Sequence, residues 1–153
     1  MVIKKMVLLG AIMLFILPQQ IFATPGLKLD VRAGNYTKDS NFFIGGGVNI
    51  NFIMVELVPN IEYVFVDDLT MYTMNLDANV GIFTMPFIKG YIGGGYARVY
   101  TKPKDMDSSS NTGFNLLVGV KLNAIVLKPY IQIKRVFVSD CDDQTVLGIG
   151  LNF

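Results

Sequence analysis

The feature that most constrains the fold of this chain is a series of strand-like segments in which apolar and polar residues alternate. Eight such segments are bounded by turn residues, and they span residues 27–37, 42–52, 57–66, 70–83, 87–100, 113–124, 128–138 and 145–153. Most contain ten residues or more, whereas strands of soluble proteins usually contain about five or six. A tilted strand needs about 9 to 11 residues to cross a bilayer. We therefore predict an all-β fold, an eight-stranded antiparallel up-and-down barrel whose strands cross a membrane.

The last of these segments carries a second indication. Apolar residues alternate along residues 147–153 and share one face of the expected strand, which ends on an aromatic residue. Gly148, Leu151 and Phe153 resemble the C-terminal assembly signal of bacterial outer-membrane proteins, although Val146 stands where that family usually has a polar residue. The chain is thus similar to the small eight-stranded outer-membrane barrels of Gram-negative bacteria, of the OmpA transmembrane domain, OmpX and OmpW type. The resemblance implies a protein that contacts outer-membrane lipid and lipopolysaccharide and is inserted by the barrel assembly machinery.

The first residues are typical of a secretory signal peptide. Lys4 and Lys5 precede an uncharged apolar run at residues 6–17, and Ala23 offers a small residue before a cleavage site. The apolar run is shorter than the roughly 20 residues that a membrane-spanning helix needs. We expect residues 1–23 to be the signal peptide and residues 24–153 to form one barrel domain. Cys141 is the only cysteine, so the chain forms no intramolecular disulfide.

The connections between the expected strands alternate in character. Polar connections follow the odd-numbered strands, at residues 38–41, 67–69, 101–112 and 139–144, and hold most of the loop aspartates. Short apolar connections follow the even-numbered strands, at residues 53–56, 84–86 and 125–127. An up-and-down barrel with two unlike ends produces this alternation. We expect the acidic polar loops on the cell exterior, and the tight turns and both termini in the periplasm.

Charged residues indicate which face of each strand points into the barrel. They share a face with polar residues and lie opposite apolar ones, and an eight-stranded barrel is narrow enough for side chains to fill it. We predict an interior ionic network formed by Lys28, Asp30, Arg32, Glu62, Asp77, Lys89, Lys121 and Lys134. Because an unpaired buried charge costs several kcal/mol, the three carboxylates should neutralise the basic residues and leave a basic excess.

A soluble, secreted, lipocalin-like barrel is the main alternative to the membrane barrel. Its apolar faces would point inward around an apolar ligand, and its polar faces would be exposed to water. This alternative explains neither the length of the strands nor the aromatic residue at position 153.

The sequence contains few features that indicate chemistry. It has no His, so the imidazole-dependent mechanisms of known outer-membrane barrel enzymes are excluded and we expect no enzymatic activity. The glycine triplets at residues 45–47 and 93–95 lack the helix and the Lys that a phosphate loop requires, so we expect them to make room for inward side chains. The aspartates at residues 140–143 match no calcium-loop spacing. A formal net charge of +1 favours no nucleic-acid partner, and we expect neither a metal nor a cofactor.

Two arginines are candidates for a contact with lipopolysaccharide. Strand parity places Arg98 and Arg135 on the outer face, near the end that we expect at the cell surface. A guanidinium binds phosphate in a two-point geometry. With one strand between them, the two Cα atoms would lie about 10 Å apart.

These expectations give one principal function and one competing function. The resemblance implies a barrel that contributes to envelope integrity or contacts an extracellular partner, as yet unidentified, through its surface loops. The competing function is that of an OmpW-like narrow channel for small molecules, which the charged inner face disfavours.

Overall fold

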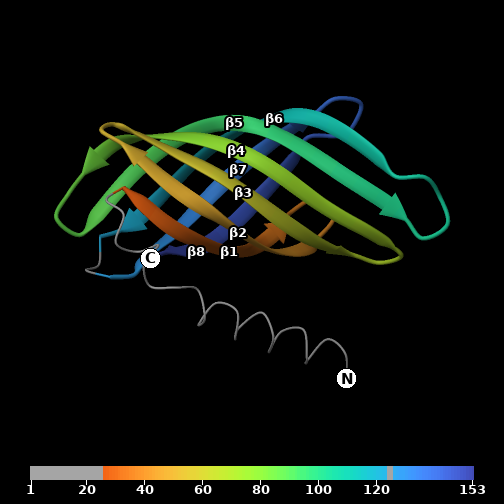
Figure 1. Cartoon of the computed structure of the whole chain (residues 1–153), viewed down its shortest axis with the longest axis horizontal. Helices are drawn as coiled ribbons and strands as arrows, with labels where there is room; N and C mark the ends of the chain where they lie inside the picture. The colour runs from red at the N-terminus through yellow and green to blue at the C-terminus, as the bar shows by residue number, and fades with distance from the viewer. Residues whose placement is uncertain (1–25, 124–125) are drawn as a thin grey trace, which may run out of the picture.

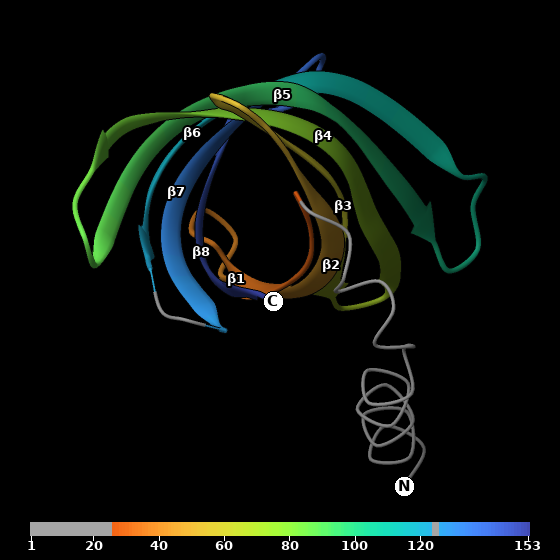
Figure 2. The same cartoon turned by 60° about the vertical axis from the view of Figure 1, so that its left-hand side comes forward.

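The chain forms a closed barrel of eight antiparallel strands in the computed structural model, which describes residues 26–123 and 126–153 (Figures 1 and 2). The strands are β1 (Leu27–Tyr36), β2 (Asn41–Phe52), β3 (Val55–Val66), β4 (Leu69–Thr84), β5 (Ile88–Pro103), β6 (Ser109–Leu122), β7 (Lys128–Val138) and β8 (Gln144–Asn152). Each strand pairs with its neighbours in sequence, and β1 pairs with β8 to close the barrel. The predicted eight-stranded up-and-down barrel is confirmed. The expected signal peptide lies outside the described residues.

No helix in the described part of the chain is long and apolar enough to span a bilayer.

The barrel has two unlike ends, as the alternating connections predicted. One end carries the polar connections after β1, β3, β5 and β7, and we call it the loop end; it lies on the right of Figure 1. The other end carries the connections after β2, β4 and β6 together with Phe153, and we call it the turn end. The loop predicted at residues 101–112 is shorter than expected, because β5 and β6 remain paired up to Thr101 and Ser109. The paired residues beyond the predicted strand ends are polar on both faces. The alternation of apolar and polar residues therefore stops before the backbone hydrogen bonds between β5 and β6 stop.

The outer wall is apolar over its whole circumference. Its middle presents side chains that are half or more exposed, such as Ile61, Leu116, Ile131 and Ile149. Aromatic rings border this band at the loop end, where Tyr72 stacks on Tyr100 and Phe114 stacks on Phe137. Apolar side chains outside and buried polar side chains inside are typical of membrane barrels and the reverse of a soluble ligand-binding barrel. The lipocalin-like alternative is therefore wrong.

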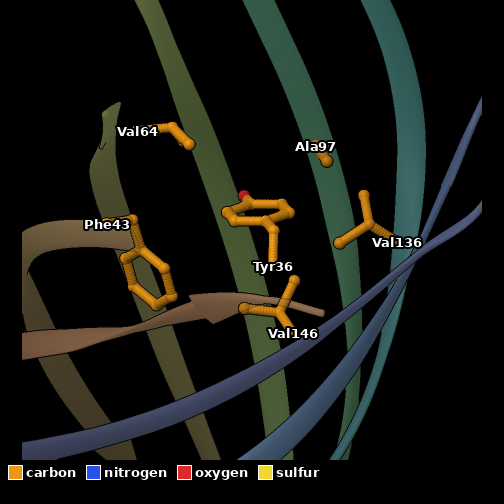
Figure 3. Close-up of a cluster of buried hydrophobic side chains, with 6 residues drawn as sticks. All are labelled: Tyr36, Phe43, Val64, Ala97, Val136 and Val146. Atoms are coloured by element: carbon orange, nitrogen blue, oxygen red, sulfur yellow. The ribbon is translucent and has the colours of Figure 1, made fainter. Parts of the chain in front are cut away.

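The barrel interior is divided into two zones, which the sequence did not predict. Near the loop end, inward side chains from β1, β2, β3, β5, β7 and β8 form an apolar cluster (Figure 3); its members are Tyr36, Phe43, Val64, Ala97, Val136 and Val146. Polar and charged side chains fill most of the rest of the interior, together with Val58, Tyr91, Leu117 and Tyr130. The expected charged interior does not extend to the loop end, because the next inward residue after the last charged one on β3 and β7 is a valine, Val64 after Glu62 and Val136 after Lys134.

Candidate functional site

The polar zone of the interior is centred on Glu62 of β3. This side chain is fully buried, and its carboxylate accepts two hydrogen bonds from Lys134 Nζ, at 2.7 and 2.9 Å. Arg32 Nη1 lies 3.5 Å from the same carboxylate, and the hydroxyls of Tyr36 and Thr73 donate to it at 3.3 and 3.2 Å. One buried anion thus holds two cations from β1 and β7 in a space that water does not reach.

A chain of contacts leads from Arg32 towards the turn end. Arg32 pairs with Asp30, with Nη2 2.5 Å from Oδ2. The other oxygen of Asp30 accepts hydrogen bonds from Tyr130 Oη and Asn152 Nδ2, both at 2.7 Å. Asn49 donates to the Asn152 side chain at 3.2 Å and also to Glu56. The network therefore joins β1, β2, β7 and β8 across the seam where the barrel closes.

At the turn end the network ends on an ion pair that sequence reasoning missed. Lys121 Nζ lies 2.6 Å from Glu56 Oε1, and it also lies over the rings of Tyr91 and Tyr130 at 5.6 and 5.9 Å. We had placed Glu56 in a turn, but β3 begins at Val55. Glu56 is therefore the first inward residue of that strand, and the alternation that includes Asn60 and Glu62 already pointed to it.

Asp77 has a different environment from the one predicted. We expected it to neutralise a buried cation, but no cation forms an ion pair with it among the described residues. Its carboxylate accepts hydrogen bonds from the Asn60 and Asn115 amides, at 3.0 and 2.9 Å. The prediction for Asp77 is wrong because the register sets it beside Val58 and Gly95, so that amides rather than cations surround it.

Two further predicted members lie at the margin of the network. Lys28 and Lys89 are half-buried near the turn end, and neither forms an ion pair with a carboxylate among the described residues. The buried charged side chains are instead three cations and four carboxylates, namely Arg32, Lys121 and Lys134 with Asp30, Glu56, Glu62 and Asp77. The expected basic excess is therefore not found among the buried residues, because Glu56 joins the network and Lys28 and Lys89 lie outside it.

The glycine triplets make room for this network. A Cβ atom on Gly45 would lie 3.0 Å from Glu62 Cγ and 3.2 Å from Arg32 Cγ. A Cβ atom on Gly95 would collide with the carboxylate of Asp77. Inward glycines on β2 and β5 thus let the large polar side chains of neighbouring strands lie flat against the wall.

The ionic network leaves almost no free space between its own side chains. The cavity between Arg32, Glu56, Tyr91 and Tyr130 measures about 10 Å³, which is about the room that one water molecule requires. Between this network and the loop end, the lumen contains the apolar cluster of Figure 3. In the described ranges, no group of three or more Cys, Asp or Glu is placed to hold a metal ion.

The residues of the expected assembly signal lie at the closing seam. Gly148 of β8 is buried opposite Gly34 of β1, and Leu151 faces outward opposite Val31. Phe153 continues the pairing beyond β8, because its amide donates to Leu29 O at 3.0 Å and its carbonyl accepts from the Leu29 amide at 2.8 Å. These residues therefore take part directly in the contact that turns the sheet into a barrel.

The two arginines face outward, but they lie further apart than expected. Arg98 is opposite Thr112 of β6 and Arg135 is opposite Leu116, so four residues along β6 separate their positions. With one strand between them, this offset gives a Cα separation of about 16 Å. Arg98 donates to Ser110 Oγ at 3.3 Å and Arg135 to Asp143 Oδ2 at 3.4 Å. The shorter estimate was wrong because it ignored the stagger between neighbouring strands.

Comparisons with known proteins agree with this architecture. No protein-family model and no curated protein sequence matches the chain. Among solved structures, the N-terminal β-barrel domain of Pseudomonas aeruginosa OprF superposes with a TM-score of 0.68 at 18% identity, over 83% of this chain and 96% of that domain. Neisserial surface protein A gives a TM-score of 0.63 at 11% identity, over 82% and 92% of the two chains. The outer-membrane enzyme PagL gives 0.59 at 10% identity, over 82% and 98%.

These similarities define the class of the protein by its fold. The chain has the fold of the small eight-stranded outer-membrane β-barrels, and the resemblance expected from the sequence is confirmed. Identities this low show the fold alone. Because one of the similar structures is an enzyme, the fold does not decide whether this protein catalyses a reaction.

Proposed function

We propose that this protein is a non-enzymatic integral barrel of the bacterial outer membrane that contributes to envelope integrity and presents its loop end to the cell exterior. The observation that carries the proposal is the filled lumen, with about 10 Å³ of free space within the ionic network. A barrel filled by paired charges and an apolar cluster is a rigid wall element rather than a conduit. The absence of His from the sequence supports the non-enzymatic part of the proposal.

The competing function, a narrow channel for small molecules, gives the opposite result in planar bilayers. We expect purified protein to produce no conductance steps beyond those of protein-free membranes, because the cavity within the ionic network is about the size of one water molecule. Reproducible steps whose frequency rises with the amount of inserted protein would establish a channel instead.

The orientation of the protein in the outer membrane is checked on intact cells through Cys141. This residue is exposed at the loop end, and it is the only cysteine of the chain. A membrane-impermeant maleimide should label it on intact cells, whereas the Cys141→Ser, Ile53→Cys variant, with its thiol at the turn end, should react only after permeabilisation. The reverse pattern of labelling would contradict the proposed orientation.

A contact with lipopolysaccharide is the second part of the proposal, and it rests on Arg98 and Arg135. Both guanidinium groups are exposed on the outer wall, and each lies over an aromatic ring, Tyr100 at 5.0 Å and Phe137 at 5.6 Å. Such a position suits the headgroup layer, where an outward arginine costs little. At a separation of about 16 Å the two side chains would hold separate phosphates rather than one.

We expect lipopolysaccharide added to phospholipid liposomes to raise the unfolding midpoint of the wild type more than that of the Arg98→Ala, Arg135→Ala variant. The matched control is Lys102→Ala, Lys104→Ala, which removes the same charge from exposed positions near the β5–β6 connection. Equal stabilisation of all three proteins would rule out the arginine contact. If lipopolysaccharide stabilises only the Lys102→Ala, Lys104→Ala variant less than the wild type, the phosphate contact lies at the β5–β6 connection instead.

A further inference from the structure

The loop end contains a cavity that none of the functions above uses. It measures about 730 Å³ and lies in the mouth of the barrel, between side chains of six strands and the connections after β1 and β7. Ligand pockets of proteins commonly measure about 300 to 1,000 Å³. The cavity is thus large enough for a small organic molecule.

The floor of this cavity is apolar and closed. It is lined by Tyr36, Met71, Val99, Val136 and Val138. Tyr36 and Val136 also belong to the apolar cluster of Figure 3, and Met71 and Val138 pack against that cluster. The cavity therefore ends above the ionic network, and it is a pocket rather than the entrance to a pore.

The rim of the cavity is acidic. Three carboxylates line it, those of Asp39, Asp140 and Asp142, against the single ammonium of Lys38. Lys38 pairs with Asp142, and this contact holds the pKa of Asp142 below its usual range, so that the carboxylate is ionised at neutral pH. Asp140 forms no hydrogen bond or ion pair with any side chain in the described part of the chain, which leaves its charge available to a ligand.

A polar acceptor at the rim also lacks a partner. The Gln144 side chain donates from Nε2 to Asp39 Oδ2 at 3.1 Å. Its other atom, Oε1, is buried and accepts no hydrogen bond within the described residues. A buried acceptor without a donor is costly, and a ligand that carries N–H groups would satisfy it.

From these features together we propose that the mouth cavity binds a small organic cation that carries an apolar group. The apolar group would contact the floor, and the cationic group would lie among the carboxylates of the rim. The same carboxylates would repel an anion of equal size, and a neutral apolar molecule would gain nothing from them. The proposed orientation decides only from which side of the membrane the ligand would reach the cavity. Binding itself does not depend on it.

Methyl NMR of the full barrel in zwitterionic detergent micelles tests the proposal, with 2-phenylethylammonium as the probe and 3-phenylpropionate as its anionic counterpart. We expect saturable shifts of the Met71, Val136 and Val138 methyl signals with the cation only. Equal shifts with the anion, or no shift with the cation up to its solubility, would overturn the proposal. Neither outcome depends on orientation, which the labelling of Cys141 tests separately.

Matched variants locate the binding site. Asp39→Asn, Asp140→Asn should weaken binding of the cation about five- to tenfold, since two charges at a partly exposed rim are lost. Asp67→Asn, Asp68→Asn changes the same charge on a loop that does not line the cavity, and it should bind as the wild type does. Val99→Trp, which fills the floor, should abolish the shifts of Val136 and Val138 while the barrel keeps its heat-modifiable migration. An equal loss in both aspartate variants, or full binding by the Val99 variant, would refute the site.

Discussion

Glu62→Leu is expected to destabilise the folded barrel by about 3 to 5 kcal/mol, because it leaves Lys134 buried without a counter-charge. The Lys134 side chain is 1% exposed, and Glu62 is its ion-pair partner among the described residues. Arg32 would lose one of its two carboxylates but keep Asp30. The urea concentration at the unfolding midpoint in lipid should therefore fall. The slope of the unfolding free energy against urea concentration should change little.

Two further variants separate the loss of charge from the loss of packing. Glu62→Leu combined with Lys134→Met removes the pair together, and it should recover most of the lost stability, since a buried ion pair replaced by apolar groups is often neutral. Asp107→Leu, an exposed loop position, should change stability by less than about 0.5 kcal/mol. If Glu62→Leu leaves the midpoint unchanged, the carboxylate does not hold a buried charge and the description of the network is wrong.

Replacement of Phe153 by Asp, or its deletion, is expected to stop assembly of the exported chain. Phe153 makes two backbone hydrogen bonds to Leu29, and its position matches the aromatic residue of the assembly signal that Gly148 and Leu151 resemble. Deletion removes both bonds at the seam, and Asp places a charge where an apolar side chain meets the membrane interface. The protein should accumulate in the periplasm without heat-modifiable migration.

Phe87→Asp is the matched control for this experiment. Phe87 lies at the same turn end and is 77% exposed, but it belongs to the connection after β4 and not to the seam. This variant should assemble at close to the wild-type level. Wild-type amounts of assembled Phe153→Asp protein would exclude a role in assembly, and equal failure of both variants would indicate a general need for apolar residues at the turn end.

The strands, their order and the direction of their side chains were predictable from local sequence, because the alternation along a strand decides which residues share a face. Asp30, Arg32, Lys121 and Lys134 are inward in the structure because each shares the parity of the polar residues around it. Glu56 shares this parity on β3 as well. It is missed by the sequence analysis because β3 begins at Val55, two residues before the predicted start of the strand. Ends of strands are hard to locate because the pattern is weakest there.

Contacts across the lumen were not predictable in the same way. Glu56 and Lys121 are 65 residues apart in sequence, and Glu62 and Lys134 are 72 apart. The stagger of all eight strand pairs together sets the height at which such residues meet. For that reason Asp77 meets amides, and Arg98 lies well away from Arg135.

The alternation of residues along the chain was thus enough to establish a membrane barrel with an apolar outside and charged residues inside. The pairing of those charges, the apolar cluster at the loop end and the cavity above it depend on the closed structure. Each of them joins residues on strands that are distant in sequence. These residues come together only when β8 pairs with β1 and closes the barrel. A pattern with a period of two residues indicates which face of a strand a residue lies on. It does not indicate how high along the barrel axis that residue lies relative to residues on the opposite side.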